Sequence, residues 1–213
     1  MKGLAERAPD TKHEIIFCPA HEGHRHAGKR LSDLSAIVDP SRIRDFTWLW
    51  GGEILVSRRV LDLFEKHRVT GFESRRAKIS YSKPIKTRPP DLFELVVTGW
   101  GGFAAAAAGV KLEESCSACG HKLYSIAEPS YLIDAVQWDG SDLFIVWPLP
   151  GYPFASDRLA SILRQEHVSG LKLFPAAAIP VKKGATLTPG ALARRMPEKR
   201  VRELERRYGF AIT

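Results

Sequence analysis

Two segments of the chain repeat one pattern of apolar and polar positions. Residues 48–73 and 147–172 align without gaps at an offset of 99 residues, and each holds apolar side chains three and four positions apart. That spacing is typical of an amphipathic helix whose apolar side faces a core. The identical positions are Trp48/Trp147, Gly52/Gly151, Ser57/Ser156, Arg59/Arg158, Val69/Val168 and Gly71/Gly170.

Each segment is bounded in the way that helices commonly are. Ser57 and Ser156 precede the apolar spacing as N-cap candidates, and a glycine ends each segment before a strand-like stretch. We therefore predict an α+β fold with two related strand–helix–strand units, at about 45–80 and 142–175. Two amphipathic helices can resemble each other by chance, but the shared Trp, Gly, Ser and Arg positions outside the apolar stripe favour a duplicated unit.

A short strand pair is expected between these units. Val110–Leu112 and Lys122–Ile126 have the composition of strands and lie on either side of two cysteines, so we predict a knuckle at 110–126. Leu92–Thr98 is a further, apolar strand candidate. We expect one α+β domain, residues 1–180, with the two units flanking the knuckle.

The C-terminal region differs in composition from the rest. Residues 175–190 are rich in proline and glycine, which is typical of a linker, and residues 181–213 are expected to form a basic helical tail. Pro197 suits the first position of a helix and Gly209 the position just past its end.

Most of the positive charge lies in this tail. The chain carries a net charge of +8, and residues 181–213 contribute +6 through nine Lys or Arg and three Glu. A basic helix can bind the phosphates of nucleic acid. The pairs Glu198/Arg202 and Glu203/Arg207, however, are spaced i,i+4, as on a solvated helix face. Nucleic acid is therefore an alternative partner and not the first choice.

The composition places the protein in the cytoplasm. The start of the chain, MKGLAERAPD, is polar and lacks the apolar region of a secretory signal. The run Gly101–Val110 is mostly alanine and glycine and falls far short of the roughly 20 residues that span a bilayer. Three cysteines, two of them three positions apart, point to metal or redox chemistry in a reducing compartment and not to a disulfide framework.

The cysteine pair has the chemistry of a zinc knuckle. Cys116 and Cys119 lie on an expected tight turn, and Gly120 permits the backbone conformation that this turn needs. Cys18 and His21 have the same spacing and supply the other half of a tetrahedral site. Four such ligands leave no open coordination position, so we predict one structural Zn²⁺.

Other interpretations of these residues stay open. A thioredoxin-like redox pair is expected at a strand-to-helix junction, whereas this pair is followed by Gly-His-Lys-Leu-Tyr. Cys18 could be a buried thiol and His21 a surface histidine. The alternative ligands for the fourth position are His24, His26 and His121.

The sequence shows no catalytic motif. HExxH, GxSxG, a Walker loop and GxGxxG are all absent, so we predict a protein that is not an enzyme. Asp139 and Asp142, with His121, are the residues of a weaker enzymatic hypothesis, but Asp-Gly after an aromatic residue is more typical of a tight turn. Arg59 and Arg158 occupy equivalent positions in the two aligned segments. A structural salt bridge or a contact with a carbonyl group explains this equivalence better than a catalytic role does.

Residues 14–175 resemble the bacterial double-CxxCG motif proteins. The resemblance rests on FCPAH, SDLS, SRRVLDLFEKHRVTGFE and LFELVVTGWGG, and then on GVKLEESCSACG, WDGSDLFIVWPLP and SDRLASILRQEHVSGLKL. It implies two knuckles that share a metal. The second knuckle is intact here, whereas the first has His21 in place of its second cysteine and Glu22 in place of its glycine.

The resemblance also implies a partner. Some members of that family resemble immunity proteins, which neutralise a cognate toxin in competition between kin bacteria. We therefore expect a non-enzymatic, zinc-stabilised binding protein of a toxin–antitoxin type of pair, whose binding surface is unknown. Exposed aromatic residues would serve as anchors, and the candidates are Trp48, Trp50, Trp100 and Tyr152, although Trp48 and Trp147 are better suited to the core. The alternative is a zinc-containing nucleic-acid-binding module that uses the basic tail.

Overall fold

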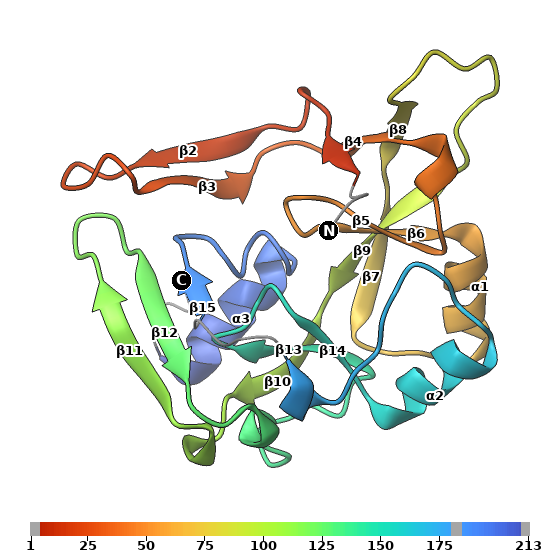
Figure 1. Cartoon of the computed structure of the whole chain (residues 1–213). Helices are drawn as coiled ribbons and strands as arrows, with labels where there is room; N and C mark the ends of the chain where they lie inside the picture. Colours follow the sequence, from red (N-terminus) through yellow and green to blue (C-terminus); the bar gives the residue numbers. More distant parts are fainter. Residues whose placement is uncertain (1–4, 180–184, 210–213) are drawn as a thin grey trace.

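A computed structural model describes residues 5–179 and 185–209, and within these ranges the chain has a mixed α+β fold (Figure 1). The helices are α1 (Arg58–Lys66), α2 (Asp157–Gln165) and α3 (Glu198–Tyr208). The strands are β1 (Glu6–Arg7), β2 (His13–Phe17), β3 (Arg25–Arg30), β4 (Ser35–Val38), β5 (Phe46–Trp48), β6 (Ile54–Ser57), β7 (Phe72–Arg76), β8 (Lys78–Tyr81), β9 (Leu92–Val97), β10 (Gly99–Phe103), β11 (Val110–Ser115), β12 (Lys122–Ile126), β13 (Leu143–Trp147), β14 (Pro153–Ala155) and β15 (Ala185–Leu187).

The strands form small sheets, of which the largest has the order β5-β6-β9-β7 with antiparallel neighbours. A second sheet, β10-β13-β14, joins the two halves of the sequence because β10 pairs in parallel with β13. The others are β1-β4-β8, β11-β12-β15 and the hairpin β2-β3. Strand β9 is buried along its whole length, as its run LFELVV predicts.

Helices α1 and α2 bury the side chains that the periodicity predicts. In α1 these are Val60, Leu63 and Phe64, and in α2 the equivalent Leu159, Ile162 and Leu163. All six belong to one core with the apolar side chains of β6, β9 and β13. Ser156 caps α2 through its hydroxyl, which accepts a hydrogen bond from the Leu159 N–H at 3.1 Å.

The two segments exchange matched contacts, and Asp45 is the centre of the first set. Its carboxylate accepts hydrogen bonds from Ser57 at 3.0 Å and Arg59 at 2.9 Å, both in its own half. It also accepts bonds from the N–H and hydroxyl of Ser169, which lies in the other half. Arg59 additionally donates to the carbonyl of Glu166 at 2.5 Å. Asp45 thus ties the start of α1 to the end of the α2 segment.

Asp142 is the centre of the second set. It accepts from Ser156 at 2.8 Å and Arg158 at 3.1 Å in its own half, and from the N–H of Thr70 at 3.0 Å in the other. Arg158 also donates to the carbonyl of His67. The prediction that both matched arginines make structural contacts is therefore confirmed.

The glycines after the helices allow this exchange. Gly71 and Gly170 have φ of 84° and 85°, which glycine adopts without strain. A Cβ at Gly71 would overlap the carbonyl of Leu143, and one at Gly170 would overlap the carbonyl of Phe46. Each glycine therefore lets one half lie against the first strand of the other.

The two units differ after these glycines. Gly71 is followed by β7, which pairs with β9, whereas residues 171–175 form no strand. The expectation of a second complete strand–helix–strand unit is wrong at this point. Pro175 and a 3₁₀ turn at Ala176–Ala178 follow directly, so the segment is too short and too restricted to form a ladder.

The C-terminal segment packs into the core, although we expected a tail outside the domain. Leu187, Leu192, Met196, Val201 and Leu204 are buried in the same core as α1 and α2. Strand β15 extends the β11-β12 hairpin. Both ends of α3 lie where the sequence predicts them. Pro197 directly precedes its first residue, and Gly209, with φ of 74°, directly follows its last.

None of the helices in the described ranges is both long enough and apolar enough to span a bilayer.

Candidate metal centre

Two hairpins from distant parts of the chain meet at their tips. One is β2-β3, whose loop runs between Phe17 and Arg25, and the other is β11-β12, whose loop runs between Ser115 and Lys122. Figure 1 shows both loops at the same edge of the molecule. The predicted strand pair around the cysteines is therefore present, with its first strand extended to Ser115.

The tips bring together Cys18, His24, Cys116 and Cys119. One ligand atom from each residue lies within 4.8 Å of all the others. The Sγ atoms of Cys18 and Cys116 are 3.6 Å apart, and Cys119 Sγ lies 3.6 Å from His24 Nδ1. In a tetrahedral zinc site with Zn–S bonds of about 2.3 Å, neighbouring sulfurs are about 3.8 Å apart. Two of the donor pairs thus already have nearly the spacing that a zinc ion imposes.

Backbone hydrogen bonds shape the second loop. The N–H of Cys116 donates to the carbonyl of His121, and the N–H of Gly120 donates to the carbonyl of Cys116, both at 2.8 Å. Gly120 has φ of 74°, so it supplies the left-handed conformation that the sequence predicted for it. These bonds close a tight turn that holds both sulfurs on one side.

The surroundings favour one thiolate. A hydrogen bond with His24, followed by one from the Cys119 backbone, lowers the pKa of Cys116 to about 6. Burial raises the pKa of Cys119 above its ordinary value. Since zinc binds thiolates, Cys116 offers a charged sulfur at neutral pH, whereas metal binding must displace the proton of Cys119.

The histidine in the cluster is His24, where we expected His21. Phe17 faces Arg25 in the β2-β3 ladder, so Cys18 and His24 come next on the two sides of the loop. His21 lies nearer the middle of that loop. Its ring contacts that of His24 at a centroid distance of 4.8 Å, but it is not among the four residues that come together.

The other two alternative histidines lie behind His24. The ring of His121 stacks on His24 at 4.4 Å and on His26 at 5.2 Å. Within the part of the chain that the structure describes, His26 Nε2 and His121 Nδ1 are buried without a hydrogen-bond partner. Burial, with His121 and His24 as neighbours, lowers the pKa of His26. The lowered pKa favours the neutral form of the His26 ring.

Asp139 and Asp142 serve the fold. The carboxylate of Asp139 accepts a hydrogen bond from the N–H of Ser141, two residues further along, which is typical of the tight turn that the sequence favoured. It also accepts a hydrogen bond from the N–H of Trp100. The carboxylate of Asp142 accepts hydrogen bonds from Thr70, Ser156 and Arg158, as described above. His121 lies at the tip of the β11-β12 hairpin.

The candidate anchor residues divide by burial. Trp100 is fully buried and donates to the Tyr208 hydroxyl at 3.0 Å, so it is removed from the surface. Trp147 is also buried, whereas Trp48 and Tyr152 are half-buried. Trp50 stands out with 68% of its surface exposed.

No family model matches the chain, and no curated protein matches it.

Proposed function

We propose that Cys18, His24, Cys116 and Cys119 hold one structural Zn²⁺ as a knuckle between the two hairpins. The observation that carries this proposal is the convergence of four donor atoms from two distant loops. Three cysteines and one histidine are a donor set that suits zinc, and with all four positions filled by protein there is none for a substrate.

A structural role for the metal is suggested by the small size of the β2-β3 hairpin. It is a two-stranded sheet, and Ile15 and Phe17 on it are more than half exposed. An isolated hairpin of this kind is marginal in water. A metal that joins its tip to the β11-β12 tip would fix it against the rest of the protein and close a loop of about a hundred residues.

We also propose that residues 48–73 and 147–172 derive from one duplicated unit. The support is the exchange of equivalent contacts centred on Asp45 and Asp142. Arg68 and His167, which occupy matched positions, also share a positive φ, of 50° and 49°.

For the biological role we propose a non-enzymatic, cytoplasmic binding protein, an immunity protein that neutralises a cognate toxin by direct contact. The closed donor set supports a metal that shapes a surface and not one that turns over substrate. Co-expression with toxins from adjacent genes tests the role. Protection of growth that is lost in a Trp50→Ala variant with unchanged stability would support it, and failure to protect against any neighbouring toxin would contradict it.

The nucleic-acid alternative is less well supported by the charges of the C-terminal segment. Arg200 pairs with Asp139 and Glu203, and Arg202 and Lys29 pair with Glu198. Arg200 and Arg202, on α3, are therefore already paired with carboxylates within the protein. Titration of a labelled duplex at low and high salt separates the two roles, since a phosphate-binding helix predicts an affinity that falls steeply with salt.

A further inference from the structure

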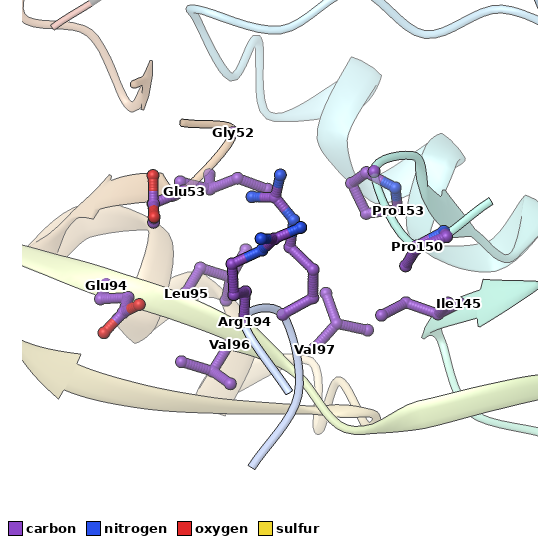
Figure 2. A pocket seen from close by; sticks show the side chains of 13 residues that line it. Gly52, Glu53, Glu94, Leu95, Val96, Val97, Ile145, Pro150, Pro153 and Arg194 are labelled. Atoms are coloured by element: carbon purple, nitrogen blue, oxygen red, sulfur yellow. The ribbon is translucent and has the colours of Figure 1, made fainter. Parts of the chain in front are cut away.

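A small cavity lies where the two halves of the protein meet the C-terminal segment. Its wall is made by the β5-β6 turn, β9, the β13-β14 turn and Arg194 and Arg195. Figure 2 shows Glu53 and Glu94 on one side, Pro150 and Pro153 on the other, and Arg194 between them. The cavity measures about 20 Å³. Since a single water needs about 10–15 Å³ on the same measure, there is room for one small species.

Four guanidinium groups gather around this cavity with only two carboxylates. Arg7 pairs with Glu53 at 2.6 Å, and Arg30 pairs with Glu94 through two hydrogen bonds of 2.6 Å. Both carboxylates are nearly inaccessible, with 3% and 6% of their side chains exposed. Each is therefore already matched by one arginine.

Arg194 and Arg195 are the two arginines in excess of these two carboxylates. Among the described residues, Arg194 donates to the carbonyl of Ala27 and the hydroxyl of Thr188, and Arg195 donates to the carbonyl of Gly51 at 2.7 Å. Neither forms an ion pair there, and Arg195 Nη1 is buried without a partner. The residues outside the described ranges, 1–4, 180–184 and 210–213, include no Asp or Glu that could supply a side-chain carboxylate.

The shape of the β5-β6 turn fixes the position of the Arg195 guanidinium. A Cβ at Gly52, which has φ of 84°, would overlap the Arg195 guanidinium, and one at Gly51 would overlap that of Arg7. The two glycines thus let both cations lie directly against the backbone of the β5-β6 turn. Burial, reinforced by Arg195 and Arg7, lowers the pKa of Arg194 to about 10. Mostly buried cations without a counter-ion destabilise a fold, so a missing anion is implied.

We propose that this cavity binds a single monatomic anion, chloride, with Arg195 Nη1 as its principal donor. Its small volume favours a monatomic anion over phosphate or a carboxylate ligand. The competing occupant is a water molecule, which could bridge Arg195 Nη1 to the equally unpartnered Glu53 Oε2. A water would satisfy both atoms but leave two positive charges without a counter-ion, whereas chloride would compensate one of them.

Thermal unfolding in chloride tests the proposal. Sodium chloride replaces sodium gluconate at constant ionic strength, with wild type as purified, Arg195→Met and the exposed-residue control Arg206→Met. Wild type and Arg206→Met are expected to show a saturable rise in Tm, because chloride at ten times its Kd shifts the folding equilibrium about 11-fold. Arg195→Met should show no such rise. A wild-type Tm that does not respond to chloride would overturn the proposal.

A second measurement does not depend on a variant that folds. Crystals of the wild-type protein grown in sodium bromide give an anomalous peak wherever a halide binds. A peak in the cavity beside Arg195 is expected, and ordered density there without anomalous signal identifies water and overturns the proposal. Neither readout depends on the zinc ligands, so the result is independent of the metal centre.

Discussion

Cys18 Sγ lies 3.6 Å from Cys116 Sγ, although 98 residues separate the two cysteines. This distance joins the N-terminal hairpin to the hairpin that follows β10, and it is close to the separation of about 3.8 Å between two sulfurs bound to one zinc ion. The hairpin tips are half-buried and polar, so little apolar burial holds them in contact. The metal ion that we propose, which would replace the thiol protons, would account for the meeting of the two loops.

His24→Ala should weaken zinc binding, whereas His21→Ala should leave it nearly unchanged. Only His24 places a ring nitrogen among the three sulfurs, and the neighbouring His21 is a matched control in the same loop. Competition with a chromogenic chelator measures the affinity, and we expect a loss of at least about tenfold for His24→Ala. Equal losses in both variants, or a loss only in His21→Ala, would show that the fourth ligand is assigned to the wrong histidine.

The metal-free protein should depend on pH through Cys116. Its folded pKa is lowered from 9.0 to about 6, so the thiolate stabilises the fold fully above pH 9. That contribution declines as the pH falls from 9 and is absent below about 6. Urea unfolding of chelator-treated protein should therefore show a slope between these values that Cys116→Ser lacks.

Ultraviolet absorbance of the thiolate provides the direct control. One cysteine of the folded, metal-free protein should titrate near pH 6, and that transition should disappear in Cys116→Ser but not in Cys119→Ser. If no cysteine of the wild type titrates near pH 6, the environment described for Cys116 is incorrect.

Asp142→Ala should destabilise the protein by about 2–4 kcal/mol, because it leaves the donor groups of three residues, from both halves, without their acceptor. Asp142 is buried, with 6% exposure, and binds Thr70, Ser156 and Arg158. Asp62→Ala, on the exposed side of α1, is the control and should change the free energy of unfolding by less than about 0.5 kcal/mol. Denaturant unfolding of both variants checks the difference, and similar values would remove Asp142 as a link between the halves.

Leu204→Ala should cost about 2–5 kcal/mol, since Leu204 is 1% exposed in the core shared by α1 and α2. A helix that only flanked the domain would tolerate this change. The same denaturant experiment applies, with Arg206→Ala on the exposed side of α3 as its control. An effect below about 0.5 kcal/mol would show that α3 is not part of the core.

The sequence predicted those features that depend on local pattern. Periodicity identified the buried side of α1 and α2, and the spacing of Cys116, Cys119 and Gly120 identified the tight turn. The match between Arg59 and Arg158 indicated structural contacts, although not that each would reach into the other half.

The features that escaped prediction depend on long-range pairing. The choice of His24 over His21 requires the register of β2 against β3, in which Phe17 faces Arg25. The charge of the C-terminal segment suggested a solvated helix face, and it did not indicate that Leu187, Leu192 and Met196 would also lie in the core. A strand after Gly170 was expected from composition, yet a strand forms only where a partner edge is available, as β9 is for β7.

The most direct test of the metal centre is the metal content of the purified protein, measured by mass spectrometry for wild type, Cys18→Ser and Cys116→Ser. We expect one zinc per chain in the wild type and none in either variant, together with a lower Tm, because each half of the site contributes ligands that the other cannot replace. Ser117→Ala, within the same turn, should keep its zinc. Wild-type protein that contains no zinc and gains no stability when zinc is added would contradict the central claim.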